Sequence, residues 1–362
     1  MNSLESIAPA DEARAVRFTG SWRDYLPIAA TNVLLTVVTL GVYRFWASAR
    51  QRRYLWSHTE VIDDTLEWTG TGREMFVGFL IVMAFLLPFF GFIQFLFPAL
   101  IARGKTSAAT GLLLLFEIGL LYLGGVARFR ALRYRLSRSW WRGIRGGSDE
   151  PGWAYGGEYL GRMIVSWISL FTMFPWTVTR LWDARWNGMS FGQLRFTSSL
   201  TAEDLKDRWG LVYAVPILAF AFGFLIFRFT NFSPGFRRGM QAELAVTLLL
   251  LIIAVYVLVP LLTLNFFAAY YRNAAAALRL GDLEFGFDAT TWQWLKLFLG
   301  NLALAVVTLG AGISYWGYRN WTFMVRHLEL YGEVDVAALV QSTTHAPREA
   351  EGFADAFDLG AM

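Results

Sequence analysis

The chain has 362 residues, of which 56% are hydrophobic and 17% are charged, and its formal net charge is +4. About a quarter of the residues in an ordinary soluble domain are charged, so this composition excludes such a domain. The sequence has no cysteine, which excludes disulfides and thiolate metal sites in this chain.

Long uncharged runs predict helices that cross a membrane. Residues 75–101 and 244–271 carry no charged side chain, and residues 111–127 carry one. A bilayer core of roughly 30 Å needs about 20 apolar residues in a helix, and a helix satisfies its own backbone hydrogen bonds in lipid. We therefore predict an all-α, polytopic membrane protein.

Two sequence patterns recur along the chain. The decapeptides "NVLLTVVTLG" at 32–41 and "NLALAVVTLG" at 301–310 share seven of their ten residues, which indicates equivalent helices in an internally repeated fold. Short strand-like tags, in which apolar and charged residues alternate, precede apolar stretches at 16–20, 66–70, 194–198 and 283–287. The tags are expected to pair as small sheets or hairpins at the membrane surface, because an isolated strand is unstable.

The tags divide the chain into about five units. Each unit runs from a tag, through one or two apolar helices, to a helix end rich in arginine and aromatic residues. We predict one repeated transmembrane domain at 16–335, between flexible tails at 1–15 and 336–362. The expected units are 16–65, 66–150, 151–193, 194–282 and 283–335.

The short units leave two topologies open. Each holds a single apolar run, so it either crosses the membrane once or turns back where the helix breaks. We favour the turn, which makes these units re-entrant or steeply bent helix pairs. Threonine and glycine tolerate non-helical backbone at membrane depth when protein covers it, and the helix-break candidates are Thr39, Gly41, Thr308 and Gly310.

Clusters of arginine predict which helix ends face the cytoplasm. Two interpretations are open: plain anchoring at the membrane surface, and specific binding of a lipid head group or another anionic ligand, since guanidinium contacts phosphate bidentately. The membrane is the nearest polyanion, so we expect anionic lipids as partners and no nucleic acid. The candidate residues are Arg50, Arg52, Arg53, Arg128, Arg130, Arg133, Arg135, Arg138, Arg142 and Arg145.

Polar residues inside the apolar runs are candidates for a transport path. Glu117 is the most informative, because a carboxylate at the bilayer centre costs roughly 3 kcal/mol and suggests a proton or cation carrier. Its expected partners from other helices are Gln94, Asn265 and Asn301, and Asn32 is a further candidate. Alternatively, the amides connect helices and the carboxyl is held neutral by a hydrogen bond.

Motifs for catalysis are weak. The sequence "GMSFG" at 188–192 matches a nucleophile elbow, but no histidine base belongs to its unit. The sequence "RGKTS" at 103–107 lacks the first glycine of a phosphate-binding loop, and the three histidines have no repeated second metal ligand. We expect no enzyme, no catalytic residue, no metal site and no cofactor.

Two stretches, at 18–59 and 133–147, resemble the YjgN family of bacterial inner-membrane proteins, a family of unknown function. The resemblance rests on the first tag, on the Thr-Leu-Gly-x-Tyr-x-x-Trp element from Thr39 to Trp46, and on the Trp-Arg-Gly-Ile-Arg element at 141–145. It implies a multi-pass protein of the bacterial inner (cytoplasmic) membrane. It supplies no activity and no functional residues.

Two functions are compatible with the sequence. The first is a transporter- or channel-like protein for a small solute, ion or lipid, with Glu117 on its path. The second is a non-transporting scaffold that binds anionic lipid or a partner protein through its arginine- and aromatic-rich helices, and a homo-oligomer is compatible with either. A connected polar row around Glu117 would favour the first, and a dry, closed helix core with a basic belt would favour the second.

Overall fold

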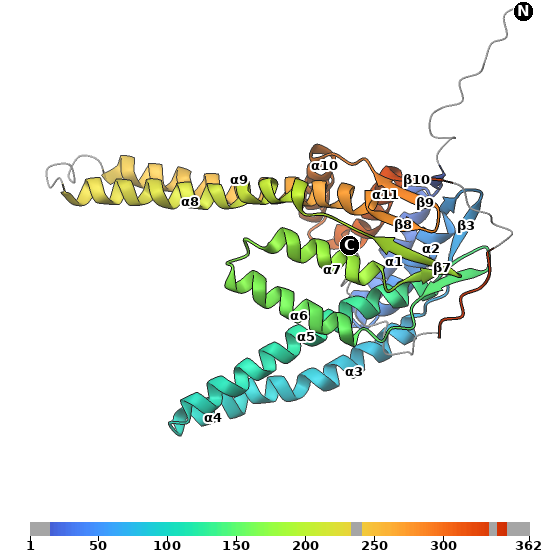
Figure 1. The fold of residues 1–362 in the computed structure, drawn as a ribbon, viewed down its shortest axis with the longest axis horizontal. Coiled ribbons are helices and arrows are strands. Elements are labelled where there is room, and N and C mark those ends of the chain that lie inside the picture. The colour runs from blue at the N-terminus through green and yellow to red at the C-terminus, as the bar shows by residue number, and fades with distance from the viewer. Residues whose placement is uncertain (1–14, 233–240, 333–338, 346–362) are drawn as a thin grey trace, which may run out of the picture.

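The strands gather into one sheet at one end of the molecule. The structure is a computed structural model that describes residues 15–232, 241–332 and 339–345. Within these ranges ten strands pair antiparallel in chain order, and β10 contacts β1, so the sheet is barrel-like and nearly closed (Figure 1). The strands are β1 (Val16–Phe18), β2 (Thr59–Val61), β3 (Asp64–Trp68), β4 (Ser139–Trp141), β5 (Ile144–Gly147), β6 (Ser190–Phe191), β7 (Leu194–Ser198), β8 (Leu278–Leu280), β9 (Leu283–Phe287) and β10 (Leu328–Tyr331).

This sheet corrects the prediction of an all-α fold with small sheets or hairpins between its units. The tags seen in the sequence are the entry strands β1, β3, β7 and β9, and each entry strand pairs with an exit strand beyond the helices. The exit strands β2, β4, β6, β8 and β10 are two to four residues long. Strands this short are too brief for an alternation such as LRL in β8 to be distinguished from chance, and they directly follow arginine-rich helix ends, so the sequence pattern did not identify them.

Tight turns join each exit strand to the next entry strand. Positive φ angles occur at Ile62 (62°), Arg142 (50°), Gly143 (74°), Gly192 (55°) and Gly281 (59°). Two-residue hairpin turns need positive φ because only then does the turn match the twist of its strands. Because these turns join neighbouring strands directly, the helices lie between the two strands of each unit, and the chain leaves the sheet and returns to it once per unit.

Helices fill each unit between its two strands. They are α1 (Trp22–Val38), α2 (Arg44–Ser57), α3 (Gly72–Gly91), α4 (Phe97–Ala102), α5 (Thr106–Arg138), α6 (Trp153–Ile168), α7 (Phe174–Trp186), α8 (Glu203–Phe232), α9 (Gln241–Ala276), α10 (Thr291–Val307) and α11 (Trp316–His327). A π-helical turn (Phe92–Leu96) joins α3 to α4, and a 3-10 turn (Ala311–Tyr315) precedes α11. Side chains of Ser21, Thr71 and Thr290 cap the first turns of α1, α3 and α10.

Long hairpins extend far from the sheet (Figure 1). One hairpin packs α4 against α5, and the other packs α8 against α9. At 1.5 Å per residue, the 33 residues of α5 and the 36 of α9 are about 50 and 54 Å long, which exceeds a bilayer core of roughly 30 Å. Among the described residues, four helical stretches are long and apolar enough to cross a membrane: Gly72–Ala102, Thr106–Arg138, Glu203–Leu225 and Val255–Ala276.

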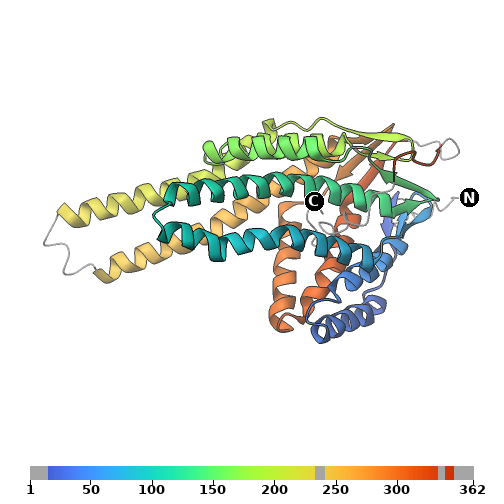
Figure 2. The ribbon, with the colours of Figure 1, turned by 90° about the horizontal axis from the view of Figure 1, so that it is seen from below.

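The remaining units are short hairpins. Their first helices, α1, α6 and α10, have 16 or 17 residues, and the chain then turns back into α2, α7 and α11. The α10–α11 hairpin, orange in Figure 2, runs at a steep angle to the long hairpins. The tips are apolar and exposed: the accessible fraction is 95% at Leu40, 76% at Leu170 and 97% at Leu309. These units therefore turn back and do not continue as single straight helices.

The tips of the first and last hairpins have matching geometry. Thr39 Oγ1 donates to the carbonyl of Leu35 at 2.7 Å, and Thr308 Oγ1 donates to the carbonyl of Leu304 at 2.6 Å. Each threonine ends its helix, and the glycine two positions later has φ 92° at Gly41 and 91° at Gly310. Glycine adopts this left-handed conformation without the penalty of a Cβ atom.

The two faces of the sheet differ in polarity. On the outer face, opposite charges face each other across the strands, as in Arg17 with Glu60 and Arg279 with Glu284. On the inner face, aromatic and aliphatic side chains pack against the helix stems, with Trp68 and Tyr134 in one buried cluster. The core of the molecule therefore lies between the sheet and the helices.

The expected tails fall mostly outside the described residues, at 1–14, 333–338 and 346–362. The segment at 339–345 is described, and it lies along the turns that flank β5. Gln341 Nε2 donates to the carbonyl of Gly143 at 2.8 Å, and Arg145 Nη2 donates to the carbonyl of Thr344. This segment is therefore docked on the sheet.

Candidate functional site

A cavity of about 740 Å³ lies between the inner face of the sheet and the helix stems. Its strand wall comes from β1, β2, β3, β9 and β10, at the place where β10 contacts β1. Helices α2 and α11 form the opposite wall, and α5 and α9 each contribute one side chain. We call it the arginine cavity, and its most polar described lining residues are Gln51, Arg52, Thr59, Arg135, Tyr271 and Asn320.

Two arginines give the cavity its charge. Arg52 of α2 is only 7% exposed, and its guanidinium lies 5.1 Å from the centre of the Trp68 ring. Arg135 is partly buried near the end of α5. The described lining residues include these two guanidinium groups and no carboxylate. Because guanidinium binds phosphate and carboxylate oxygens with paired hydrogen bonds, the cavity suits an anion.

The spacing of side chains along α2 explains why Arg52 points inward. Ala49, Arg52 and Trp56 recur every three or four residues and are all buried, whereas Arg50 and Arg53 fall on the exposed face. Residues at this spacing share one side of a helix. Packing of α2 against the sheet therefore carries Arg52 into the cavity.

Tryptophans fix the walls of the cavity. Trp56 and Trp321 stack with their ring centres 4.1 Å apart. Trp56 Nε1 donates to Ser139 Oγ at 2.8 Å, and Trp321 Nε1 donates to Thr59 Oγ1 at 2.8 Å. Both indoles thus have a partner in the sheet, as buried indole N–H groups require. The walls are held by hydrogen bonds as well as by packing.

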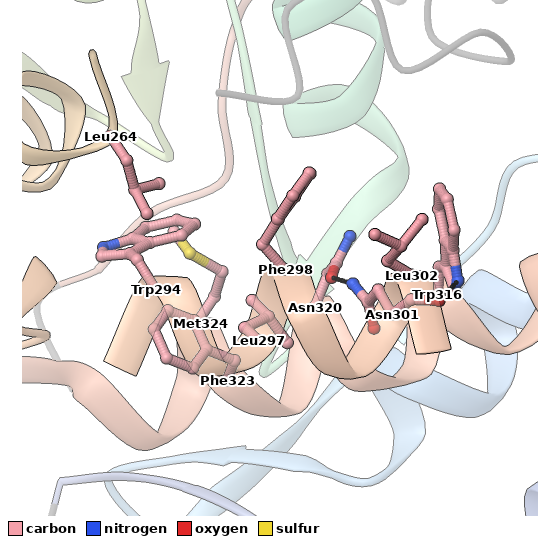
Figure 3. Close-up of a pocket in the computed structure, with 10 residues that line it drawn as sticks. All are labelled: Leu264, Trp294, Leu297, Phe298, Asn301, Leu302, Trp316, Asn320, Phe323 and Met324. Atoms are coloured by element: carbon pink, nitrogen blue, oxygen red, sulfur yellow. Dashed lines mark hydrogen bonds between the residues drawn. The ribbon is translucent and has the colours of Figure 1, made fainter. Parts of the chain in front are cut away.

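A smaller, apolar pocket of about 320 Å³ adjoins the cavity (Figure 3). We call it the apolar groove, and it lies between α10 and α11, with Leu264 of α9 at one side. Asn301 Nδ2 donates to Asn320 Oδ1 at 2.8 Å within it. Asn320 and Met324 line both the groove and the cavity. The two spaces therefore share a wall.

Comparison with known proteins assigns the chain to a family. The family described as "Bacterial protein of unknown function (DUF898)" matches residues 13–356. The chain belongs to this family. The resemblance to YjgN that the sequence motifs predicted is confirmed by curated relatives carrying that name.

The curated relatives match parts of the chain. Inner membrane protein YjgN of Salmonella typhimurium is 29% identical over 132 residues, which cover 34% of this chain and 32% of the relative. The Escherichia coli K12 protein of the same name is 38% identical over 68 residues, which cover 19% of this chain and 17% of the relative. The matches thus span about a third or less of these relatives. No solved structure matches the chain.

These relatives are named inner membrane proteins, and the four apolar helical stretches described above fit a membrane protein. No group of three or more histidine, aspartate or glutamate side chains that would hold a metal ion occurs in the described part of the chain. The family description gives no activity, so the site must be interpreted from its own residues.

Glu117 lies apart from both spaces. Its side chain is on the exposed side of α5, and within the described ranges it makes no hydrogen bond or ion pair. Gln94 is exposed in the π-helical turn, and Asn265 accepts hydrogen bonds from Arg208 and Thr291. Asn301 bonds to Asn320. None of the expected partners contacts Glu117, so these residues do not form a connected polar row in the described structure.

Asn32 occupies the position in the first decapeptide that Asn301 occupies in the second. It is 5% exposed and its Nδ2 donates to the carbonyl of Ala47 at 3.3 Å. This bond joins α1 to α2 within one hairpin. Asn32 therefore acts as a contact between helices and lines neither space.

The predicted arginines divide among several contacts. Arg138 pairs with Glu74, Arg142 with Asp63, and Arg128 bonds to Tyr159. Arg130 and Arg133 donate to the carbonyls of Pro151 and Glu150. Burial lowers the pKa of Arg145, with a further contribution from the charge of Arg138, and its side chain is engaged by the segment at 339–345. Only Arg52 and Arg135 of the predicted set line the cavity.

The other polar lining residues were not among the sequence candidates. Gln51 and Asn320 lie in helix ends rich in arginine and aromatic residues, and Tyr271 is the last residue of an apolar run. A signal existed for Asn320, because Trp316, Asn320 and Met324 follow at four-residue spacing and share one side of α11. An amide between two apolar residues on the same side of a helix indicates a polar contact on that side.

Proposed function

We propose that this protein is a non-enzymatic, multi-pass protein of the bacterial inner membrane that binds the head group of an anionic lipid in the arginine cavity. The supporting observation is the pair of arginines, Arg52 and Arg135, in a cavity whose described lining has no carboxylate. Both guanidinium groups line the same cavity, and an anion bound there would form charge-assisted hydrogen bonds with them.

The arrangement of the helices supports a cavity at the level of lipid head groups. In this proposal the long hairpins cross the bilayer, and the sheet lies on the cytoplasmic side, where the arginine-rich helix ends gather. The short hairpins enter one leaflet, because their exposed tips at Leu40, Leu170 and Leu309 are apolar. The cavity then lies between the sheet and the membrane surface, where the phosphates of the inner leaflet are found.

Head-group binding combines parts of the two functions considered from the sequence. In a carrier, the lipid bound in the cavity would be the substrate. In a scaffold, the same bound lipid would attach the protein to the membrane surface. A path for ions along Glu117 receives less support, because its expected partners lie elsewhere. The matching hairpin tips also support an internally repeated architecture, in which the hairpins are variants of one unit.

The experiment is a lipid titration of the purified protein in a neutral detergent. Dioctanoyl phosphatidylglycerol is compared with dioctanoyl phosphatidylcholine, and binding is followed by tryptophan fluorescence, because Trp56 and Trp321 line the cavity and Trp68 lies against Arg52. We expect saturable binding of the anionic lipid only. Removing one charge-assisted contact of about 1.5–3 kcal/mol by Arg52→Gln is expected to weaken it roughly 10- to 100-fold.

Arg53→Gln is the matched control. It removes the same charge one position along α2, but its side chain is on the exposed face. We expect at most a small change in affinity, because an exposed charge contributes little at physiological salt. Equal weakening by Arg52→Gln and Arg53→Gln, or equal binding of the two lipids, would overturn the proposal.

A further inference from the structure

We propose that the apolar groove between α10 and α11 holds the acyl chain of a single-chain anionic lipid whose head group occupies the arginine cavity. This inference rests on the proposed function and names the class of ligand: a phosphate-bearing amphiphile with one chain, such as a lysophospholipid. It is carried by the lining residues that the two spaces share, by the difference in polarity between them, and by the exposure of Phe298 on α10.

The groove is lined by one side of each helix. Trp294, Leu297, Phe298 and Leu302 follow along α10 at a spacing of three or four residues. Phe323 and Met324 face them from α11 (Figure 3). From Trp294 to Leu302 the helix rises about 12 Å, so the groove is elongated along α10. Its volume of about 320 Å³ is near the lower limit of known ligand pockets. An elongated, narrow and apolar space suits one hydrocarbon chain.

The cavity and the groove differ in polarity. The cavity supplies the guanidinium groups of Arg52 and Arg135, whereas the groove supplies mainly hydrocarbon, with the bonded amides of Asn301 and Asn320 among its apolar side chains. A lysophospholipid has the same two parts, a phosphate-bearing head group and a hydrocarbon chain. Asn301 is only 8% exposed, and its Oδ1 has no hydrogen-bond partner within the described residues. Asn32 Oδ1, at the equivalent position of the first decapeptide, is buried without a partner in the same way, so this oxygen is a feature of both hairpins and does not identify a contact for the ligand.

The first hairpin provides an internal comparison. In the decapeptide alignment, Tyr25 and Ala29 of α1 correspond to Trp294 and Phe298 of α10. Tyr25 is 0% exposed and Ala29 3% exposed, because the last hairpin covers them: Tyr25 stacks on Tyr318 at 4.9 Å. On α10, Trp294 stacks on Tyr271, whereas Phe298 is 60% exposed. The last hairpin therefore leaves open at Phe298 what protein covers at Ala29 on the first, and the groove lies there.

The test compares three probes in a neutral detergent by isothermal titration calorimetry. They are lauroyl lysophosphatidylglycerol, lauroyl lysophosphatidylcholine and glycerol 3-phosphate, which has the phosphate without a chain. The wild-type protein is expected to bind the first at least tenfold more tightly than lauroyl lysophosphatidylcholine, whose head group has no net charge, and at least tenfold more tightly than glycerol 3-phosphate, which has no chain to bury. Leu302→Trp, which fills the groove, is expected to weaken the first at least roughly tenfold and to leave glycerol 3-phosphate unchanged.

Leu299→Trp is the matched control, because Leu299 is on the same helix, is 49% exposed and does not line the groove. It is expected to leave all three affinities unchanged. A wild-type measurement that needs no folded variant uses a lysophosphatidylglycerol with a photoreactive diazirine near the chain end. After irradiation and digestion, the adducts are expected on peptides that contain Phe298, Leu302 or Met324.

The outcomes separate this inference from the proposed function. One outcome keeps the head-group site but overturns the groove inference. In it, lysophosphatidylglycerol and glycerol 3-phosphate bind with equal affinity, both affinities fall in Arg52→Gln, and neither changes in Leu302→Trp. If Leu302→Trp blocks binding that does not depend on Arg52, the groove takes hydrocarbon alone and the anionic class is overturned. Adducts spread over the long hairpins, with none on α10 or α11, would also overturn the inference.

Discussion

The substitution Glu74→Gln tests what fixes the base of the first long hairpin. Glu74 lies in the first turn of α3 and joins it to the end of α5. Its carboxylate accepts hydrogen bonds from Arg138 Nη2 at 2.9 Å and from the Tyr134 hydroxyl at 2.8 Å. Glu74 also completes a capping box with Thr71. Glutamine preserves the capping box and the volume of the side chain, so the substitution removes mainly the negative charge.

The expected loss follows from the burial of the pair. The exposed fraction of the side chain is 18% at Glu74 and 21% at Arg138. Breaking a buried ion pair costs about 3–5 kcal/mol, because one charge is left without compensation. Partial exposure and the hydrogen bonds that an amide retains reduce this cost. We expect the free energy of unfolding to fall by about 2–3 kcal/mol for Glu74→Gln, and by about 1–2 kcal/mol for Tyr134→Phe, which removes one hydrogen bond.

The assay is denaturant unfolding of the purified protein in a mild detergent, followed by circular dichroism. Glu284→Gln is the control, because Glu284 pairs with Arg279 on the outer face of the sheet and 53% of its side chain is exposed. An exposed pair contributes about 0–1 kcal/mol, so this variant is expected to unfold almost as the wild type does. Equal losses for Glu74→Gln and Glu284→Gln would refute the argument that burial sets the strength of these pairs.

Three further predictions concern the hairpins. Gly41→Ala is expected to lower the free energy of unfolding by about 1–2 kcal/mol, because alanine resists the φ of 92° at Gly41 although no neighbour would touch its Cβ. Gly91→Ala is the control: Gly91 has helical backbone, so the change is expected not to lower stability in thermal unfolding. A cysteine introduced by Leu40→Cys is expected to react more slowly with a membrane-impermeant maleimide than one introduced by Glu284→Cys, because the lipid would shield the tip of the first hairpin. Equal rates would contradict insertion of that tip into the membrane. Glu117→Gln is expected to leave stability unchanged, and a changed proton flux in liposomes would revive the transport hypothesis.

Much of the fold followed from local sequence patterns. The apolar runs at 75–101, 111–127 and 244–271 lie within the helical segments of the long hairpins, as expected for a chain that must satisfy its own backbone hydrogen bonds in lipid. The tip turns were visible as well, since Gly41 and Gly310 adopt a conformation that other residues resist. The closed sheet was not predictable in this way. Its exit strands are set by pairing with entry strands many residues away, and an alternation over only two to four residues is too short to identify a strand.

The candidate site was predicted only in part. Arg52 and Arg135 were in the predicted set, but so were Arg53 and Arg138, which have the same composition around them and different contacts. Which guanidinium faces the cavity depends on how α2 and α5 pack against the sheet, and a sequence pattern does not specify that rotation. Glu117 was a candidate because a carboxylate is costly in the bilayer core. That energetic cost does not by itself show which residue, if any, lies beside the carboxylate.

Pairing in chain order has a consequence for biogenesis. Each entry strand finds its partner at the other end of its own unit, so the sheet can extend unit by unit as the chain leaves the ribosome and its hairpins enter the membrane. The contact between β1 and β10 is different, because it joins the two ends of the domain. The arginine cavity lies at this contact, and α11 and β10 supply part of its wall. A ribosome-bound chain that has not yet produced β10 therefore lacks part of the cavity wall, and in the proposed function the head group binds only after the last unit has been made.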